Sequence, residues 1–215
     1  YYYEMYEAEK NIGSFLKNLI NQPEEIVDEA EVARLLKNYE QKQGIEYASK
    51  QKEAINYFLK SSCMILTGGP GTGKTTIVQA LLKIYKTLFP EDKIGLVAPT
   101  GRAAKRLNEL TGISACTIHR LLKWDLHSNT FAMNEKNPLD IEVLVIDEFS
   151  MVDCLLLHRI FLAGKRIRKI LFIGDYHQLP SVAPGNVLHD LIAAGIKTIE
   201  LDEIFRQTKE SGIIQ

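Results

Sequence analysis

The sequence has almost no net charge, few cysteines and no long apolar run. Its 215 residues carry 26 Lys and Arg against 27 Asp and Glu, a formal net charge of −1 at pH 7. Such a chain has no overall field that would draw it to nucleic acid, so any nucleic-acid site has to be a local basic patch. No apolar run approaches the ~20 residues that a membrane helix needs, and no signal peptide is visible, so we expect no membrane partner.

The cysteines are widely spaced and form no C-x-x-C pattern; they are Cys63, Cys116 and Cys154. We therefore expect reduced thiols in the core of a cytoplasmic protein, and neither a metal site nor a set of disulfides. A composition of 46% hydrophobic and 25% charged residues suits one sizeable domain with an appendage, or two small domains. The chain opens with Tyr1 and stops just after a motif, and we interpret it as a piece of a longer protein.

Short apolar runs alternate with helical patterns from residue 49 onward, which predicts a mainly parallel sheet covered by helices on both faces. The predicted strands are 63–67, 94–98, 142–146, 169–174 and 196–201. The predicted helices are 49–60, a helix from the glycine-rich segment to about 89, 102–111, 153–163 and 186–194, with a short helical stretch at 115–124. The basic run 165–169 is interpreted as a solvated link between a helix and a strand. Three of the five histidines, His158, His177 and His189, are interpreted as structural, since no zinc spacing joins them.

Residues 1–45 are predicted to form a small helical region packed on the main domain, with helices at 5–20 and 24–39. A partner-binding helix pair is the alternative, but amphipathic helices usually face their own core. Ser49 is the expected N-cap of the next helix.

A glycine-rich segment follows the first predicted strand and opens a helix, which is the context of a phosphate-binding loop. The alternative is a plain glycine-rich turn. Backbone N–H groups and the positive helix end would bind phosphate oxygens. Lys74 would add a charge for the β- and γ-phosphates and Thr75 a hydroxyl for Mg²⁺. The predicted nucleotide-binding residues here are Gly68, Gly69, Pro70, Gly71, Thr72, Gly73, Lys74, Thr75 and Thr76.

Two further polar segments follow predicted strands. Asp147 and Glu148 end strand 142–146, and we expect Asp147 to hold Mg²⁺ and Glu148 to act as general base toward the attacking water. Two solvated acids at a strand end are the alternative. Gln178 and Asp175 follow strand 169–174, where a Gln could donate to a γ-phosphate; a polar loop explains them equally well.

The ordered set of motifs resembles superfamily 1 DNA helicases of the RecD-like group, which includes the exodeoxyribonuclease V alpha subunit and TraA-type helicases. The resemblance covers about residues 46–210 and implies a RecA-like P-loop NTPase fold of three layers. The matching segments are GGPGTGKTT (68–76), APTGRAAKRL (98–107), TIHRLL (117–122), VIDEFSMVD (145–153), GDYHQLPSV (174–182) and LDEIFRQ (201–207).

The resemblance implies roles for further residues. Gln51 would read the adenine edge, Phe205 would pack on the adenine ring, and Arg206 would reach the γ-phosphate as a catalytic arginine. The single-stranded DNA backbone would be touched by Thr100, Gly101, Arg102, Thr117 and His119. The local basic patch over residues 98–124 agrees with that assignment, although a solvated basic helix face is the alternative for any one of its side chains.

The resemblance also implies a division of the chain, in which residues 46–215 would be the first RecA-like ATPase domain. Residues 124–138 would form an inserted β-hairpin that acts as a strand-separating pin. Residues 201–215 would begin a link to a second RecA-like domain that this sequence lacks. We therefore expect a motor domain that uses ATP and Mg²⁺ and binds single-stranded DNA, from an ATP-dependent 5′–3′ DNA helicase of recombination or repair, with nuclease or helicase subunits as possible partners. A small-molecule kinase and a DNA-binding module that uses nucleotide only structurally are the alternatives.

Overall fold

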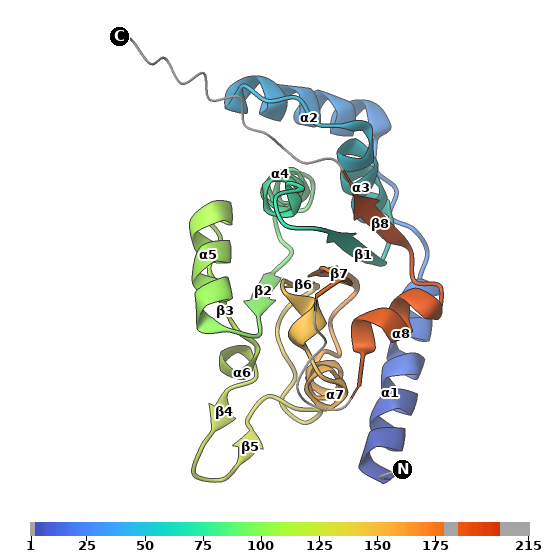
Figure 1. Ribbon diagram of the computed structural model, residues 1–215, viewed down its shortest axis with the longest axis vertical. Coiled ribbons are helices and arrows are strands. Elements are labelled where there is room, and N and C mark those ends of the chain that lie inside the picture. The colour runs from blue at the N-terminus through green and yellow to red at the C-terminus, as the bar shows by residue number, and fades with distance from the viewer. Residues whose placement is uncertain (1–2, 179–184, 203–215) are drawn as a thin grey trace.

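Six parallel strands form the central sheet of the computed structural model, which describes residues 3–178 and 185–202 (Figure 1). Their order across the sheet is β3-β2-β6-β7-β1-β8, so the strand before the glycine-rich segment has β7 on one side and β8 on the other. The strands are β1 (Cys63–Gly68), β2 (Ile94–Ala98), β3 (Ala115–Thr117), β6 (Val143–Ile146), β7 (Lys169–Gly174) and β8 (Thr198–Leu201).

Helices cover both faces of this sheet, as the alternating pattern predicted. The side chains of each strand alternate between the two cores: Ile65 lies in one apolar cluster and Leu66 in the other. One cluster includes residues of α1 (Tyr3–Ile20), α6 (Ile118–Leu121), α7 (Cys154–Ala163) and α8 (Val187–Ala193). The other includes residues of α2 (Glu29–Gln43), α3 (Ser49–Lys60), α4 (Lys74–Leu88) and α5 (Gly101–Thr111). The three-layer α/β sandwich is therefore confirmed.

The two N-terminal helices lie on opposite faces of the sheet and share its cores. Helix α1 packs on α7, where the Phe15 and Phe161 rings stack with their centroids 4.1 Å apart. Helix α2 packs on α4 through buried Val32, Leu36 and Tyr39. Each therefore presents its apolar face to a layer of the same sandwich, and they do not form a helix pair of their own.

Three sequence expectations about local structure were wrong. The second helix begins at Glu29, because the Asp28 carboxylate caps the Ala30 N–H at 2.9 Å, and it ends at Gly44 in the left-handed region. Helix α3 is capped at Ala48 and not at Ser49. The stretch expected to be helical from residue 115 begins as strand β3, which pairs with β2 at the sheet edge and leaves one helical turn, α6.

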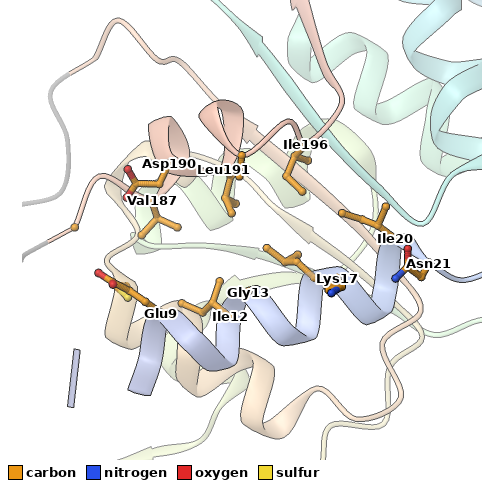
Figure 2. Close-up of a pocket in the computed structure, with 14 residues that line it drawn as sticks. Glu9, Ile12, Gly13, Lys17, Ile20, Asn21, Val187, Asp190, Leu191 and Ile196 are labelled. Atoms are coloured by element: carbon orange, nitrogen blue, oxygen red, sulfur yellow. The ribbon is translucent and has the colours of Figure 1, made fainter. Parts of the chain in front are cut away.

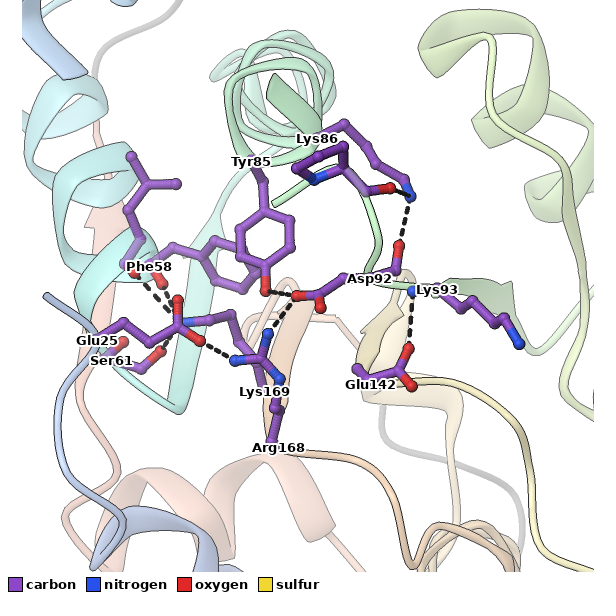
Figure 3. Close-up of polar contacts among 12 residues, drawn as sticks. Glu25, Phe58, Ser61, Tyr85, Lys86, Asp92, Lys93, Glu142, Arg168 and Lys169 are labelled. Carbon is purple, nitrogen blue, oxygen red and sulfur yellow. Dashed lines mark hydrogen bonds and ion pairs between the residues drawn. The ribbon is translucent and has the colours of Figure 1, made fainter. Parts of the chain in front are cut away.

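The basic run 165–169 links α7 to β7 and begins with the exposed Lys165 and Arg166, but its last residues are not solvated. Lys169 is 1% exposed, and its ammonium donates to the carbonyls of Phe58, Leu59 and Ser61 at the end of α3. The neighbouring Arg168 forms ion pairs with Glu25 and Asp92, so one strand start joins three segments that are distant in sequence (Figure 3). Buried cations need such partners, which the run of charges by itself does not reveal.

The expected hairpin is present but short. Strands β4 (Trp124–Asp125) and β5 (Thr130–Phe131) pair antiparallel. The Trp124 and Phe131 rings pack with centroids 4.6 Å apart, and the turn is closed by the Asp125 carboxylate, which accepts from the His127 N–H at 3.0 Å. One apolar side chain, Leu126, stands 82% exposed in this polar turn.

A groove of about 620 Å³ lies between α1 and α8 (Figure 2). Its floor is apolar, with Ile12, Val187 and Leu191, and Lys17 and Asp190 stand at its rim. All three cysteines are free thiols, two of them buried. Within the described residues, no helix has the length and hydrophobicity to cross a membrane.

Candidate functional site

The three neighbouring strands β6, β7 and β1 end at the same edge of the sheet and bring the predicted nucleotide residues together. Asp147 and Glu148 follow β6, Asp175 and Gln178 follow β7, and the glycine-rich loop follows β1. All of these segments line one cavity of about 590 Å³. The carboxyl edge of a parallel sheet is where ligands bind in this architecture, so the cavity is the candidate active site.

The loop depends on glycine at two positions where the backbone requires it. Gly68 has φ +153°, and a Cβ there would lie 2.6 Å from the Leu201 carbonyl oxygen. Gly73 has φ +81° at the start of α4, where no side chain caps the helix. The first N–H groups of α4 therefore remain for a ligand, and the positive helix end favours an anion.

Lys74 lies inside the loop and is half-buried. Its ammonium donates to the Gly68 carbonyl at 2.5 Å and to the Gly69 carbonyl at 2.9 Å. Burial lowers the pKa of Lys74, while the nearby carboxylates of Asp175 and Asp147 oppose that change. A phosphate oxygen would replace loop carbonyls as the acceptor and would supply the countercharge that a half-buried ammonium needs.

Asp147 and Glu148 form a partly buried acidic pair. Burial raises the pKa of Asp147 and, together with the neighbouring Asp147 charge, raises the pKa of Glu148. The Asp147 carboxylate accepts from the Glu148 N–H at 2.9 Å. Glu148 has φ +50°, a strained conformation for a residue with a side chain, and such strain gathers at functional sites.

Gln178 lies where the β7 loop turns toward the cavity. Its backbone N–H donates to the Asp175 carbonyl at 3.1 Å, and its side-chain amide lies 3.5 Å from the Asp175 carboxylate. Gln178 lines the same cavity as Lys74.

The predicted DNA contacts follow the next two strands of the sheet, β2 and β3. Thr100 caps α5, its hydroxyl accepting from the Ala103 N–H at 3.2 Å, and Thr117 caps α6 in the same way through the Arg120 N–H. Gly101 and Arg102 are exposed at the start of α5. The His119 ring lies at the base of the hairpin, 5.9 Å from the Phe131 ring.

Three of the predicted nucleotide residues that the structure describes do not line this cavity: Gln51, Gly68 and Gly69. Gln51 is 3% exposed, its side-chain oxygen accepts from the Ala48 N–H at 2.9 Å, and it does not line the cavity. Its adenine-reading role stays a prediction. Phe205 and Arg206 lie outside the described residues.

Six residues of the cavity wall had no predicted role at the nucleotide: Ile45, Ala103, Arg106, Leu110, Ser150 and Gly174. Ser150 has a buried hydroxyl without a hydrogen-bond partner among the described residues. Ile45 and Leu110 supply apolar surface, and Arg106 reaches the cavity from α5. Arg106 belonged to the expected basic patch, and only the helical spacing of Ala103, Arg106 and Leu110 could have separated it from its neighbours.

The side chains present fit a nucleotide with Mg²⁺. Among the described residues, no group of three or more His, Cys, Asp or Glu side chains could hold a metal by itself. Magnesium commonly takes one or two carboxylates and completes its shell with substrate phosphates and water. Asp147 and the hydroxyl of Thr75, both on the cavity wall, match that requirement, and the orphaned Ser150 hydroxyl offers a further polar partner.

The sheet order, the loop and the acidic strand end define a P-loop NTPase of the RecA-like kind. Residues 51–184 match the family described as AAA domain, and the chain belongs to that family, as a RecD-like member of helicase superfamily 1. The predicted family is thereby confirmed.

Curated relatives and solved structures agree with this placement. The RecBCD enzyme subunit RecD of Buchnera aphidicola is 33% identical over 214 residues, which cover 89% of this chain and 34% of that protein. The ATP-dependent RecD2 DNA helicase of Deinococcus radiodurans is 37% identical over 168 residues, 78% of this chain and 23% of that protein. The Pif1 helicase from Candida albicans has a TM-score of 0.56 at 26% identity, over 76% of this chain and 41% of that one. The chain thus spans less than half the length of each.

Proposed function

We propose that the chain is the ATP-binding motor domain of an ATP-dependent DNA helicase. The observation that carries the proposal is the order of functional segments along one sheet edge. Nucleotide residues follow β6, β7 and β1, and the expected DNA residues follow the adjacent β2 and β3. Two ligands that share one rigid sheet edge can influence each other through the short helices and loops between them.

The proposed reaction is in-line attack of water on the γ-phosphate of ATP. Lys74 offsets the charge that develops on the phosphate oxygens, and Glu148 orients the water and accepts its proton. Gln178 contacts the γ-phosphate and loses this contact when the phosphate leaves after hydrolysis. Arg206 is the second contact to the γ-phosphate. Magnesium, held by Thr75 and Asp147, would supply further charge neutralisation at the phosphates.

The remaining parts of the proposal concern the longer protein. We propose 5′–3′ movement, a role in recombination or repair, a cytoplasmic location, a second RecA-like domain that completes the ATP site, and nuclease or helicase subunits as partners. The present chain would bind single-stranded DNA weakly, hydrolyse ATP slowly and not separate duplex strands. The hairpin would act as the pin at the duplex junction.

The kinase alternative explains fewer of the sequence motifs. A small-molecule kinase also needs a phosphate acceptor pocket and lid arginines, and the segment GDYHQLPSV has no role in it. A DNA-binding module with a structural nucleotide would share the cavity but would not couple hydrolysis to DNA.

Calorimetric titration of the chain with ATP and Mg²⁺ tests the nucleotide site. We expect saturable, Mg²⁺-dependent binding that is lost in Lys74→Ala. Loss of the ammonium removes charge-assisted hydrogen bonds worth about 1.5–3 kcal/mol, or roughly 10- to 150-fold in affinity. Equal affinity of the two proteins, or no binding by the unmodified chain, would contradict the assignment.

A further inference from the structure

Helix α5 faces two sites at once. Its N-terminal end carries the proposed DNA contacts Thr100, Gly101 and Arg102, since it begins directly after β2. Further along, Ala103, Arg106 and Leu110 line the nucleotide cavity. These three residues are spaced by three and four positions, so they form one stripe of the helix.

The helix is fixed against the sheet between these two regions. Ala103 and Ala104 are buried and form a small cluster with Ala98 of β2, which allows a close approach of helix and strand. Leu107 is buried in the core beside α4. A helix held on both sides of Arg106 presents that side chain to the cavity from a defined position.

The guanidinium of Arg106 is available to bind a ligand. Within residues 3–178 and 185–202 it forms no hydrogen bond or ion pair, whereas the adjacent Lys105 lies 3.9 Å from the Glu109 carboxylate. Arg106 lines the same cavity as Lys74, Asp147 and Glu148.

Those three neighbours identify the end of the nucleotide that Arg106 faces. Lys74, Asp147 and Glu148 are the residues proposed for the terminal phosphate, its metal and the attacking water. A cation that lines one cavity with all three is positioned to reach the terminal phosphate. A guanidinium is suited to that position because its planar fork binds phosphate oxygens with two parallel hydrogen bonds.

We propose that Arg106 binds the terminal phosphate of ATP and, through α5, links that phosphate to the DNA contacts at the start of the same helix. This inference rests on the proposed function. It separates Arg106 from the basic patch to which its sequence position assigned it. Binding of a triphosphate at one part of α5 then changes DNA affinity at its start, and by linkage DNA changes nucleotide affinity by the same factor.

The first test measures nucleotide affinity by calorimetry, with ADP and with a non-hydrolysable ATP analogue, in the presence of Mg²⁺. We expect Arg106→Ala to weaken analogue binding at least tenfold and ADP binding less than threefold. Arg106→Lys, which keeps the charge but not the fork, should recover part of the loss. Lys105→Ala is the matched control on the next position of α5 and should match the unmodified chain for both nucleotides.

The second test measures the affinity for a single-stranded oligonucleotide by fluorescence anisotropy, with and without the analogue. We expect Arg106→Ala to remove the effect of the analogue on DNA affinity. Unchanged analogue binding in Arg106→Ala, or equal loss for both nucleotides, overturns the proposal. So does a loss of DNA affinity without nucleotide and with normal analogue binding, because Arg106 would then be a DNA contact. Failure of the unmodified chain to bind either nucleotide would instead refute the proposed function, and this inference with it.

Discussion

Two residues of the nucleotide site have backbone angles that side chains rarely adopt. Gly68 has φ +153° at the end of β1, and Glu148 has φ +50° at the end of β6. Such conformations cost roughly 1–3 kcal/mol for an ordinary residue. At Gly68 the absence of a side chain removes this conformational free-energy cost. At Glu148 the residue carries a side chain, so the cost remains. The contrast indicates that the Glu148 side chain is required where it stands.

Replacement of Gly68 by alanine should destabilise the fold. The new Cβ would meet the Leu201 carbonyl oxygen of β8 and the Thr72 hydroxyl, so β1, β8 and the loop could not all keep their positions. We expect a loss of at least about 1–3 kcal/mol in unfolding free energy, measured by urea denaturation.

Gly69→Ala is the matched control for that measurement. A Cβ at Gly69 meets no atom within 4 Å, and the residue has no positive φ, so the unfolding free energy should change little. Equal destabilisation by the two substitutions would show that the close approach at Gly68 is not the cause.

At this scale, the sequence predicted the residues whose type and spacing are tied to one kind of chemistry. Lys74, Thr75 and Asp147 line one cavity because strand ends of a parallel sheet meet at one edge. Lys169 was assigned wrongly to a solvated link, and Arg106 too broadly to a basic patch. A run of basic residues does not reveal whether one of its side chains is buried, paired or facing a ligand. Only the contact of Lys169 with the end of α3, and the position of Arg106 on the cavity wall, separate these cases.

At the scale of elements, the boundaries that failed are those where tertiary contacts outweigh local pattern. Residues 24–28 have helical apolar spacing but remain non-helical; Glu25 pairs with Arg168, and Asp28 starts the helix after them. Residues 115–117 look helical, but they complete the sheet edge beside β2. A single sequence does not show which residue about 20 or 140 positions away a side chain or strand will contact. Buried strands and long amphipathic helices, in contrast, are predicted by the local spacing of their apolar residues.

The hairpin is the element whose role is most open to a direct test. Leu126 stands exposed in its turn, where an apolar side chain is not needed for the fold. If the hairpin meets a duplex junction, Leu126 can pack on the terminal base pair, as apolar side chains do at base steps. Leu126→Ser should then weaken binding to forked DNA about fivefold, or roughly 1 kcal/mol, relative to single-stranded DNA of equal length.

Anisotropy with labelled oligonucleotides provides that comparison. Ile26→Ser is the matched control, because Ile26 is likewise an exposed apolar side chain and lies in the link between α1 and α2. A Leu126→Ser protein with an unchanged preference between the two DNAs would count against a pin at this turn.

At the scale of the whole molecule, a buried cation joins the layers. Lys169 at the start of β7 holds the C-terminal carbonyls of α3, and its ammonium lies 5.2 Å from the centre of the Phe58 ring (Figure 3). Burial lowers the pKa of Lys169 from 10.5 to about 8. Between these two values the unfolded chain binds more protons than the folded one, so the folded state gains stability as the pH rises.

This difference predicts a pH-dependent stability. The unfolding free energy of the unmodified chain, minus that of Lys169→Met, should rise by on the order of 2–3 kcal/mol between pH 8 and pH 10.5. Subtraction cancels the titration of other lysines and tyrosines. Lys165→Met, at an exposed position of the same run, should show no such slope. A flat or falling difference for Lys169 would contradict a buried, readily deprotonated ammonium.

The central claim is that one sheet edge joins an ATP site to a DNA site. The most direct measurement is the steady-state ATP hydrolysis rate of the chain as single-stranded DNA is added, with Lys74→Ala as the control. The account predicts a slow rate that rises with DNA and is absent in the Lys74→Ala protein. A rate that does not respond to DNA, or DNA stimulation that survives Lys74→Ala, would contradict it.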